Sequence, residues 1–264
     1  MEAGRERSTD RAGLRIERLS KQFGGLLAID DFELEVGVGA VHGIIGPNGA
    51  GKTTLMHIIS GYLAPSSGRV WLGDTLLTGR PPHVVTTLGV ARTFQKIRPF
   101  QGLTVLEVVM LGRHRHARAG IGGVLLGLPW VRREEEAVRS RAQEFLSFVG
   151  LSGRDSTPME NLPLGLQRLL QIASALATEP RLLLLDEPAS GLSRDERSAL
   201  ERLLLRIHES GVTVLLVEHD VGLVMRVCET ITVLNFGRKI AEGSPSSIQQ
   251  DDHVRSAYLG VGTL

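Results

Sequence analysis

The segment that most constrains the fold is the run Gly46-Pro47-Asn48-Gly49-Ala50-Gly51-Lys52-Thr53-Thr54. It follows an apolar stretch, residues 41–45, that predicts a short buried strand, and it precedes residues 55–59, whose apolar spacing predicts a helix. Glycines in such a turn let successive backbone N–H groups point into one concavity, where the positive end of the helix dipole also attracts anions. The pattern G-x-x-x-x-G-K-[ST] in this setting predicts a polyphosphate site, with Lys52 on the terminal phosphates and the Thr53 hydroxyl on Mg²⁺. The alternative is a chance glycine turn, which the flanking strand and helix disfavour.

Composition narrows the class of protein. With 264 residues, 42% of them hydrophobic, the chain can bury a full core as one large domain or one domain with an insertion. A net charge of +1 gives no broad attraction to nucleic acid, so no nucleic-acid partner is expected. The single cysteine, Cys228, excludes an internal disulfide framework and is typical of a reducing compartment.

The N-terminus and the apolar runs bear on localisation. No apolar run approaches the roughly 20 residues that a membrane span needs. Residues 1–13 are charged and lack the apolar centre of a signal peptide, so we expect them to form a flexible tail. We therefore expect a soluble, cytoplasmic protein that reaches a membrane only through a partner.

The pattern along the chain predicts an α/β core interrupted by helices. Residues 14–19 and 32–36 alternate apolar and polar side chains, as half-exposed strands do, and short strands are expected at 69–72 and 89–95. Residues 104–150 have a helical pattern, broken by a glycine- and leucine-rich loop at 120–129, so a helical insertion is predicted at about 98–160. Phe23, in the expected loop between the first two strands, either stacks on a base or packs on the edge of the sheet.

The basic run Arg113-His114-Arg115-His116-Ala117-Arg118 lies inside this insertion. A solvated face is its simpler interpretation, and a contact with a partner or with anionic lipid headgroups is the alternative. His114 and His116 are two residues apart and would not share a helix face, which argues against a metal site.

Acidic and histidine side chains follow two apolar strands in the second half of the chain. Asp186 and Glu187 end the apolar stretch 182–185, and a parallel sheet delivers such acids to the carboxyl edge where ligands bind. We expect Asp186 to hold the Mg²⁺ shell and Glu187 to act on a water molecule. His219 ends the next apolar stretch at 211–217, and we favour a phosphate contact over a purely structural role. Helices are predicted at 163–178, 193–209 and 246–259, and a closing hairpin at 231–243.

Together these residues resemble the ATP-binding cassette (ABC) ATPases that drive membrane transporters. The resemblance runs from about residue 14 to the end of the chain. The matching positions, in chain order, are Phe23 as the adenine-stacking aromatic, Gly46 to Thr54 as the phosphate loop, Gln95 as the glutamine of the Q-loop, Leu162 to Arg168 at the signature, Leu182 to Glu187 as the second nucleotide motif, and His219 as the switch histidine.

Within that superfamily the chain looks most like the larger ATPase subunit of branched-chain amino acid importers. The features that point there are the runs 23–26, 91–95, 162–168 and 218–225, the insertion at 120–135 and the ending Ala257-Tyr258-Leu259-Gly260. Some relatives in this subfamily carry urea, amides or aromatic acids, so the resemblance does not fix the solute.

The resemblance implies a fold and a set of roles. The implied fold is α/β: a P-loop NTPase core with a mainly parallel sheet, an N-terminal antiparallel β part and the inserted helical subdomain, all within one ABC ATPase domain at 14–264. ATP and Mg²⁺ are the implied cofactors, with Glu187, His219 and Gln95 in catalysis, and Thr53, Gln95 and Asp186 around the metal.

The implied partners place the chain on the inner face of the cell membrane as a peripheral protein. They are integral membrane permease subunits, a second ABC ATPase subunit that is either a copy or a paralogue, and, indirectly, an extracytoplasmic solute-binding protein.

The signature segment Leu162-Pro163-Leu164-Gly165-Leu166 departs from the superfamily pattern. Pro163 stands where the family has serine, and Leu166 where it has glutamine, whereas Gly165 is kept. In the family this segment binds the γ-phosphate of the ATP held by the opposite subunit. Pro163 offers neither a hydroxyl nor an N–H, and losing one charge-assisted hydrogen bond costs roughly 1.5–3 kcal/mol. We therefore expect weakened closure at one site and an enzyme that is still active.

Two other classes of protein share parts of this pattern. A soluble ABC-type switch acting on DNA or ribosomes, not coupled to a transporter, usually has two cassettes in one chain or long coiled-coil arms, and neither is present. A GTPase or a small-molecule kinase would share only the phosphate loop, and a GTPase should carry an Asn-Lys-x-Asp guanine motif, which the sequence lacks.

Overall fold

Two β-sheets and a set of helices make up the fold, seen here in a computed structural model that describes residues 12–93, 102–113, 129–252 and 254. The larger sheet has six strands in the order β10-β9-β3-β8-β7-β6, and the smaller has four in the order β2-β1-β4-β5. The larger sheet contains β3 (Val41–Ile45), β6 (Val90–Arg92), β7 (Leu182–Asp186), β8 (Thr213–Val217), β9 (Thr230–Asn235) and β10 (Arg238–Gly243). The smaller sheet contains β1 (Ala12–Phe23), β2 (Leu26–Gly37), β4 (Ser67–Leu72) and β5 (Thr75–Leu76).

The larger sheet is parallel except for its edge strand β10, which pairs with β9 in the antiparallel sense. All residues of β3, β7 and β8 are buried. Along β8, Val214 and Leu216 pack on one face while Leu215 and Val217 pack on the other. Burial on both faces explains why these strands are continuous apolar runs in the sequence.

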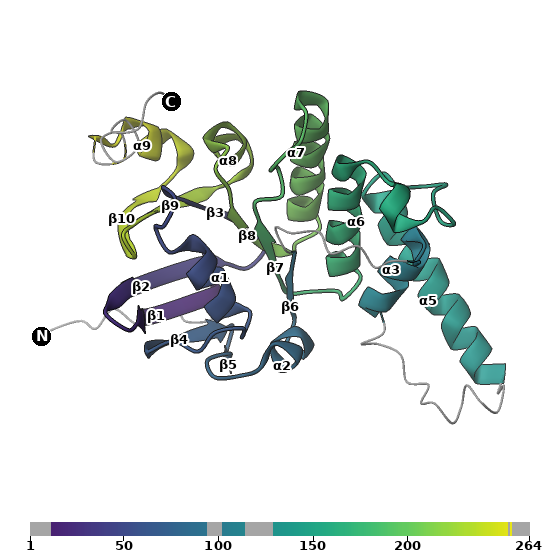
Figure 1. The fold of residues 1–264 in the computed structure, drawn as a ribbon, viewed down its shortest axis with the longest axis horizontal. Helices are drawn as coiled ribbons and strands as arrows, with labels where there is room; N and C mark the ends of the chain where they lie inside the picture. The colour runs from purple at the N-terminus through teal and green to yellow at the C-terminus, as the bar shows by residue number, and fades with distance from the viewer. Residues whose placement is uncertain (1–11, 94–101, 114–128, 253, 255–264) are drawn as a thin grey trace, which may run out of the picture.

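The helices lie on both sides of the larger sheet. The strands of the smaller sheet pair in the antiparallel sense. In Figure 1 this smaller sheet and α1 lie on one side of the molecule, and α3, α5 and α6 lie on the other. The helices are α1 (Lys52–Ile59), α2 (Pro82–Thr87), α3 (Val105–Arg113), α5 (Pro129–Phe148), the 3-10 turn η3 (Met159–Asn161), α6 (Leu164–Leu176), α7 (Arg194–Glu209), α8 (Val221–Val227) and α9 (Pro245–Gln250). Among the described residues, no helix combines the length and apolar character that crossing a membrane requires.

The segment predicted as a helical insertion contains α3 and α5. Its two ends are tied together: the Val105 N–H donates to Thr157 O (2.9 Å), and the Met159 N–H donates to Leu103 O (3.0 Å). Buried residues of α3 and α5, including Val109 and Leu146, share one apolar cluster with α6. The predicted boundary at 98 lies outside the described residues, and the boundary at 160 stays a prediction.

The boundaries predicted for the first two strands were wrong. β1 begins at Ala12, so the predicted tail at 1–13 overlaps the first strand. β1 and β2 extend through residues predicted as a loop and place Phe23 at the end of a strand. Bulges around Leu19 break the alternation that would have indicated this pairing. α9 ends at Gln250, inside the helix predicted at 246–259; Asp252 and Val254 are again helical, and the predicted end at 259 lies outside the described part of the chain.

A buried histidine near the start of strand β3 makes the free energy of unfolding depend on pH. His42 of β3 is 2% exposed, and its Nε2 lies 2.8 Å from Thr232 Oγ1. Burial lowers the pKa of His42 from 6.5 to about 4, so the unfolded chain takes up this proton first as the pH falls. The contribution of neutral His42 is therefore present above pH 6.5 and is lost towards pH 4.

We expect the free energy of unfolding to fall by about 2 kcal/mol between pH 7 and pH 5 from this group alone. Urea unfolding of the wild type and of His42→Gln at both pH values measures it, and the variant should lose this part of the pH dependence. The same change at the exposed His83 is the control. Equal pH dependence in the wild type and His42→Gln would contradict the prediction.

Candidate nucleotide-binding site

The glycine-rich run joins β3 to α1 as a tight loop. A Cβ atom on Gly46 would lie 2.1 Å from Leu234 O, and Gly51 has a φ of 106°, so glycine is required at both positions. Gly51 is the N-cap of α1 and makes no side-chain hydrogen bond there. The first turn of α1 is thus left with backbone N–H groups available to a bound anion.

Lys52, the first residue of α1, lies over this loop. Its Nζ donates to Gly46 O (2.6 Å) and to Pro47 O (3.0 Å), and the residue is 6% exposed. Burial lowers the pKa of Lys52, while the charges of Glu187 and Asp186 oppose that shift. Lys52 therefore lies close enough to Glu187 and Asp186 for its charge to interact with both carboxylates.

Asp186, at the end of β7, is held by an arginine from the neighbouring strand. Arg92 Nη2 lies 2.8 Å from Asp186 Oδ2, and both side chains are buried, with 5% and 6% exposed. Arg92 Nη1 also donates to Ser60 Oγ (2.9 Å), which follows the end of α1. This buried ion pair fixes the carboxylate that the sequence assigns to Mg²⁺.

The donor set fits a nucleotide-bound Mg²⁺. Such a metal needs only one or two protein oxygens, since phosphates and water supply the others. Asp186 provides a buried carboxylate, and Thr53, next to Lys52, provides an exposed hydroxyl. In the part of the chain that the structure describes, no group of three or more His, Cys, Asp and Glu side chains is placed so that it could hold a metal ion.

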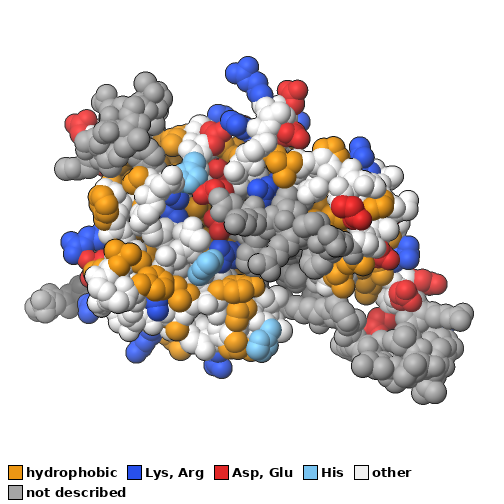
Figure 2. Space-filling model, in the orientation of Figure 1, with side chains coloured by type: hydrophobic (Ala, Val, Ile, Leu, Met, Phe, Trp, Pro, Cys, Tyr) orange, Lys and Arg blue, Asp and Glu red, His pale blue; other side chains and the backbone are white. Residues whose placement is uncertain are grey.

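Glu187 and His219 meet at the carboxyl ends of the adjacent strands β7 and β8. Glu187 Oε1 lies 2.6 Å from His219 Nε2. Glu187 has a φ of 50°, a left-handed conformation that turns the chain sharply after β7. Charged and histidine side chains gather near the middle of the face shown in Figure 2.

The signature segment lies at the start of α6, beside the loop that follows Glu187. Pro163 is the N-cap of α6 and makes no side-chain hydrogen bond. Hydrogen bonds from the Ser193 N–H and hydroxyl lower the pKa of Glu196, and the N–H of Gly165, which also donates to this carboxylate, lowers it to a smaller extent. Glu196 also completes the capping box of α7 with Ser193. Leu164 is exposed, and Leu166 packs on the apolar cluster around α6.

The roles predicted for Phe23 and Gln95 are not tested by these contacts. Phe23 is 46% exposed at the end of β1, and Lys21 Nζ lies 5.1 Å from the centre of its ring. Gln95 lies outside the described residues. The remaining ATP-binding positions, Pro47, Asn48, Gly49, Ala50 and Thr54, belong to the loop and the first turn of α1.

Sequence reasoning gave no role to three residues that the structure places at the site: Arg92, Glu196 and Glu218. Only Glu196 had a readable local signal, the Ser-x-x-Glu capping box at 193–196. The partners of the other two are distant in the sequence.

Comparison with known proteins identifies the family. The ABC transporter family pattern matches residues 29–190, and the pattern described as branched-chain amino acid ATP-binding cassette transporter matches residues 238–263. The chain is 39% identical over 249 residues to the high-affinity branched-chain amino acid transport ATP-binding protein LivG of Escherichia coli strain K12, covering 94% of this chain and 97% of LivG. The chain belongs to the ABC transporter family of ATP-binding proteins. This confirms the resemblance and the ATPase class predicted from the sequence motifs.

Solved structures of ABC cassettes share the fold. The crystal structure of the ADP conformation of an ATP-binding cassette of an ABC transporter has a TM-score of 0.82, 32% identity, and covers 94% of this chain and 99% of that one. A dimeric post-hydrolysis cassette bound to ADP and Pi has a TM-score of 0.74 and 26% identity, covering 88% and 98%. The predicted α/β fold class is therefore confirmed, and this chain, as a member of the ABC family, is a nucleotide-binding protein.

Proposed function

We propose that this chain is the ATP-hydrolysing subunit that powers an ABC importer of branched-chain amino acids or related small polar solutes. The main support is the contact between Glu187 and His219, 2.6 Å apart, at the sheet edge that also carries Lys52 and Asp186. Similarity to LivG over nearly the whole chain favours branched-chain amino acids as the solute.

Hydrolysis proceeds by in-line attack of water on the γ-phosphate, and such catalysis is mostly positioning and charge neutralisation. The loop N–H groups and Lys52 neutralise the phosphates, and Phe23 stacks on the adenine. Glu187 takes the proton of the attacking water, and His219 steadies the γ-phosphate. Thr53 and Asp186 would hold Mg²⁺, which would neutralise the phosphates further, and Gln95 is the residue expected to sense the metal or the water.

A second ATPase subunit completes each site through its signature segment. Here that segment offers the N–H of Gly165 and the dipole of α6. The Glu196 carboxylate accepts this N–H in the single chain, so closure on a facing nucleotide exchanges one acceptor for another. The helical part docks on integral membrane permease subunits, which places the chain at the inner face of the cell membrane, with a solute-binding protein acting indirectly from the other side.

The solute is tested on the isolated complex of this chain with its membrane subunits. We expect leucine, isoleucine or valine, delivered with the solute-binding protein, to stimulate ATP hydrolysis, because transport and hydrolysis are coupled. Urea, short amides and aromatic acids are the comparison solutes. Stimulation by one of these alone would contradict the branched-chain assignment, and co-purification with ribosomes in place of membrane subunits would contradict the transporter role.

A further inference from the structure

Glu218 is a buried acid that the proposed chemistry does not use. It lies between the end of β8 and His219 and is 3% exposed. Carboxylates are rarely buried unless their oxygens are paired. Its Oε1 accepts the Ala189 N–H (2.6 Å), and its Oε2 accepts the His219 N–H (3.0 Å). The Asp220 N–H is a further donor to this carboxylate.

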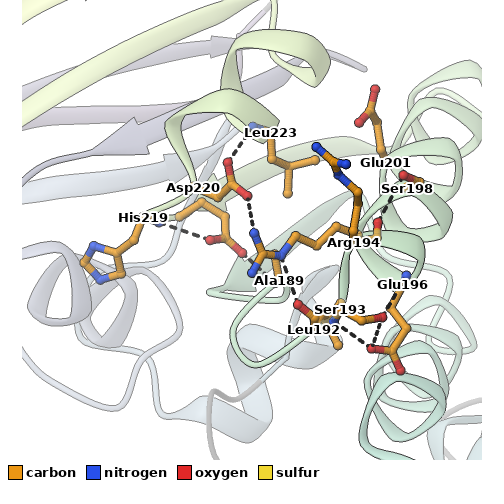
Figure 3. A network of polar contacts seen from close by, with 12 residues as sticks. Ala189, Leu192, Ser193, Arg194, Glu196, Ser198, Glu201, His219, Asp220 and Leu223 are labelled. Carbon is orange, nitrogen blue, oxygen red and sulfur yellow. Dashed lines mark hydrogen bonds and ion pairs between the residues drawn. The ribbon is translucent and has the colours of Figure 1, made fainter. Parts of the chain in front are cut away.

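These donors belong to two different loops. Ala189 is in the turn after Glu187, whereas His219 and Asp220 follow β8. One side chain therefore joins the two segments that carry the proposed base and the switch histidine. Figure 3 shows Ala189 and His219 on these neighbouring segments, each joined by a dashed line to the carboxylate between them.

A second bridge joins the same two loops farther from β7. Arg197 Nε donates to Leu192 O (3.0 Å), and Arg197 Nη1 lies 3.3 Å from Asp220 Oδ2. This pair is partly exposed, with 48% and 30% of the side chains accessible, and so contributes little energy. The buried Glu218 is the stronger of the two connections.

The position of Glu218 is unfavourable apart from these bonds. Burial raises the pKa of Glu218, and the nearby charge of Glu187 raises it further. Arg168 of α6 faces both carboxylates and offsets part of this repulsion. Glu187 itself is in a left-handed conformation that persists only where the surroundings impose it. The burial of Glu218 beside Glu187 is explained if the role of Glu218 is to fix the conformation of Glu187.

We propose that Glu218 is a positioning residue that holds the Glu187 turn against His219, so that base and histidine act on the same phosphate. This inference rests on the proposed function, in which Glu187 and His219 carry the hydrolysis. Glu218 does not touch the nucleotide and acts only through the two loops.

The test compares Glu218→Gln and Glu218→Ala with the wild-type chain. Glutamine keeps one acceptor oxygen and turns its NH₂ group towards an N–H donor, and alanine removes both acceptors. We expect kcat for ATP hydrolysis to fall, by up to about 10²-fold for alanine, since small misplacements of reacting groups have effects of this size. The Kd of ATP should stay at the wild-type value, because the phosphate loop is unchanged.

Thr213→Val is the matched control. Thr213 is buried at the opposite end of β8, and its Oγ1 accepts the Gly39 N–H (2.9 Å). This variant also loses a buried acceptor and should lower Tm, but should leave kcat unchanged. Unchanged kcat in both Glu218 variants would overturn the proposal, and so would a parallel loss of kcat and ATP affinity that follows Tm.

Hydrogen exchange of the Ala189 amide tests the hydrogen bond between Ala189 and Glu218 independently of activity. The amide should be protected in the wild type and should exchange faster in Glu218→Gln; rapid exchange in the wild type would overturn the proposal even if neither variant folds. A wild-type complex that fails to hydrolyse ATP would instead contradict the proposed function, and the exchange measurement would still decide the role of Glu218.

Discussion

Replacing Glu187 by glutamine is expected to reduce ATP turnover by at least about 10²-fold, the usual contribution of a general base. The amide has nearly the same shape as the carboxylate and keeps an oxygen facing His219 Nε2, now 2.6 Å from Glu187 Oε1. It cannot take up the proton of the attacking water. Phosphate release at saturating ATP measures turnover, and calorimetry measures the Kd of ATP, which should not rise.

The contrast with Lys52→Ala separates chemistry from binding. Lys52 lies over the phosphate loop, with Nζ 2.6 Å from Gly46 O, so its loss should remove ATP binding and turnover together. Glu209→Gln, at an exposed position near the end of α7, is the control for the charge change and should behave as the wild type. Normal turnover by Glu187→Gln would show that the base lies elsewhere.

The parts of the site that the sequence predicts well are those built from local patterns. β3, the loop and α1 are continuous in the chain, so glycine spacing and apolar periodicity are enough to predict them. The same holds for Asp186 and Glu187, because an apolar strand in a parallel sheet ends at the edge where ligands bind.

The β1–β2 hairpin was only partly predictable. Arg18 and Asp31 both have a φ of 45°, and the bulges near them shift the register, so inward and outward positions stop alternating. A prediction based on strict alternation of apolar and polar residues therefore ends both strands too early. The pairing continues because backbone hydrogen bonds do not depend on that alternation.

The side chains that support the site were not predictable from local patterns. Arg92 and Asp186 are 94 residues apart, and Ala189 and Glu218 are 29 apart. Only the order of strands in the sheet brings the members of each pair together, and no local pattern around Arg92 or Glu218 indicates the partner. Motifs reveal the groups that touch the nucleotide, whereas the groups that orient them depend on the tertiary fold.

Arg92→Met is expected to lower the free energy of unfolding by about 3–5 kcal/mol, because removing one partner of a buried ion pair leaves the other charge uncompensated. The affected charge is that of Asp186, whose Oδ2 lies 2.8 Å from Arg92 Nη2 in a site where both side chains are nearly inaccessible. Methionine fills a similar volume but donates to neither Asp186 nor Ser60. Urea unfolding, followed by circular dichroism, measures the change.

A matched variant and a second substitution test the cause. Arg238→Met breaks an ion pair with Asp30 in which the arginine side chain is 73% exposed, and it should cost less than about 1 kcal/mol. Adding Asp186→Asn to Arg92→Met removes the stranded charge and should restore part of the lost stability. Equal effects of Arg92→Met and Arg238→Met, or no recovery in the double variant, would mean that the buried charge of Asp186 is not what Arg92 stabilises.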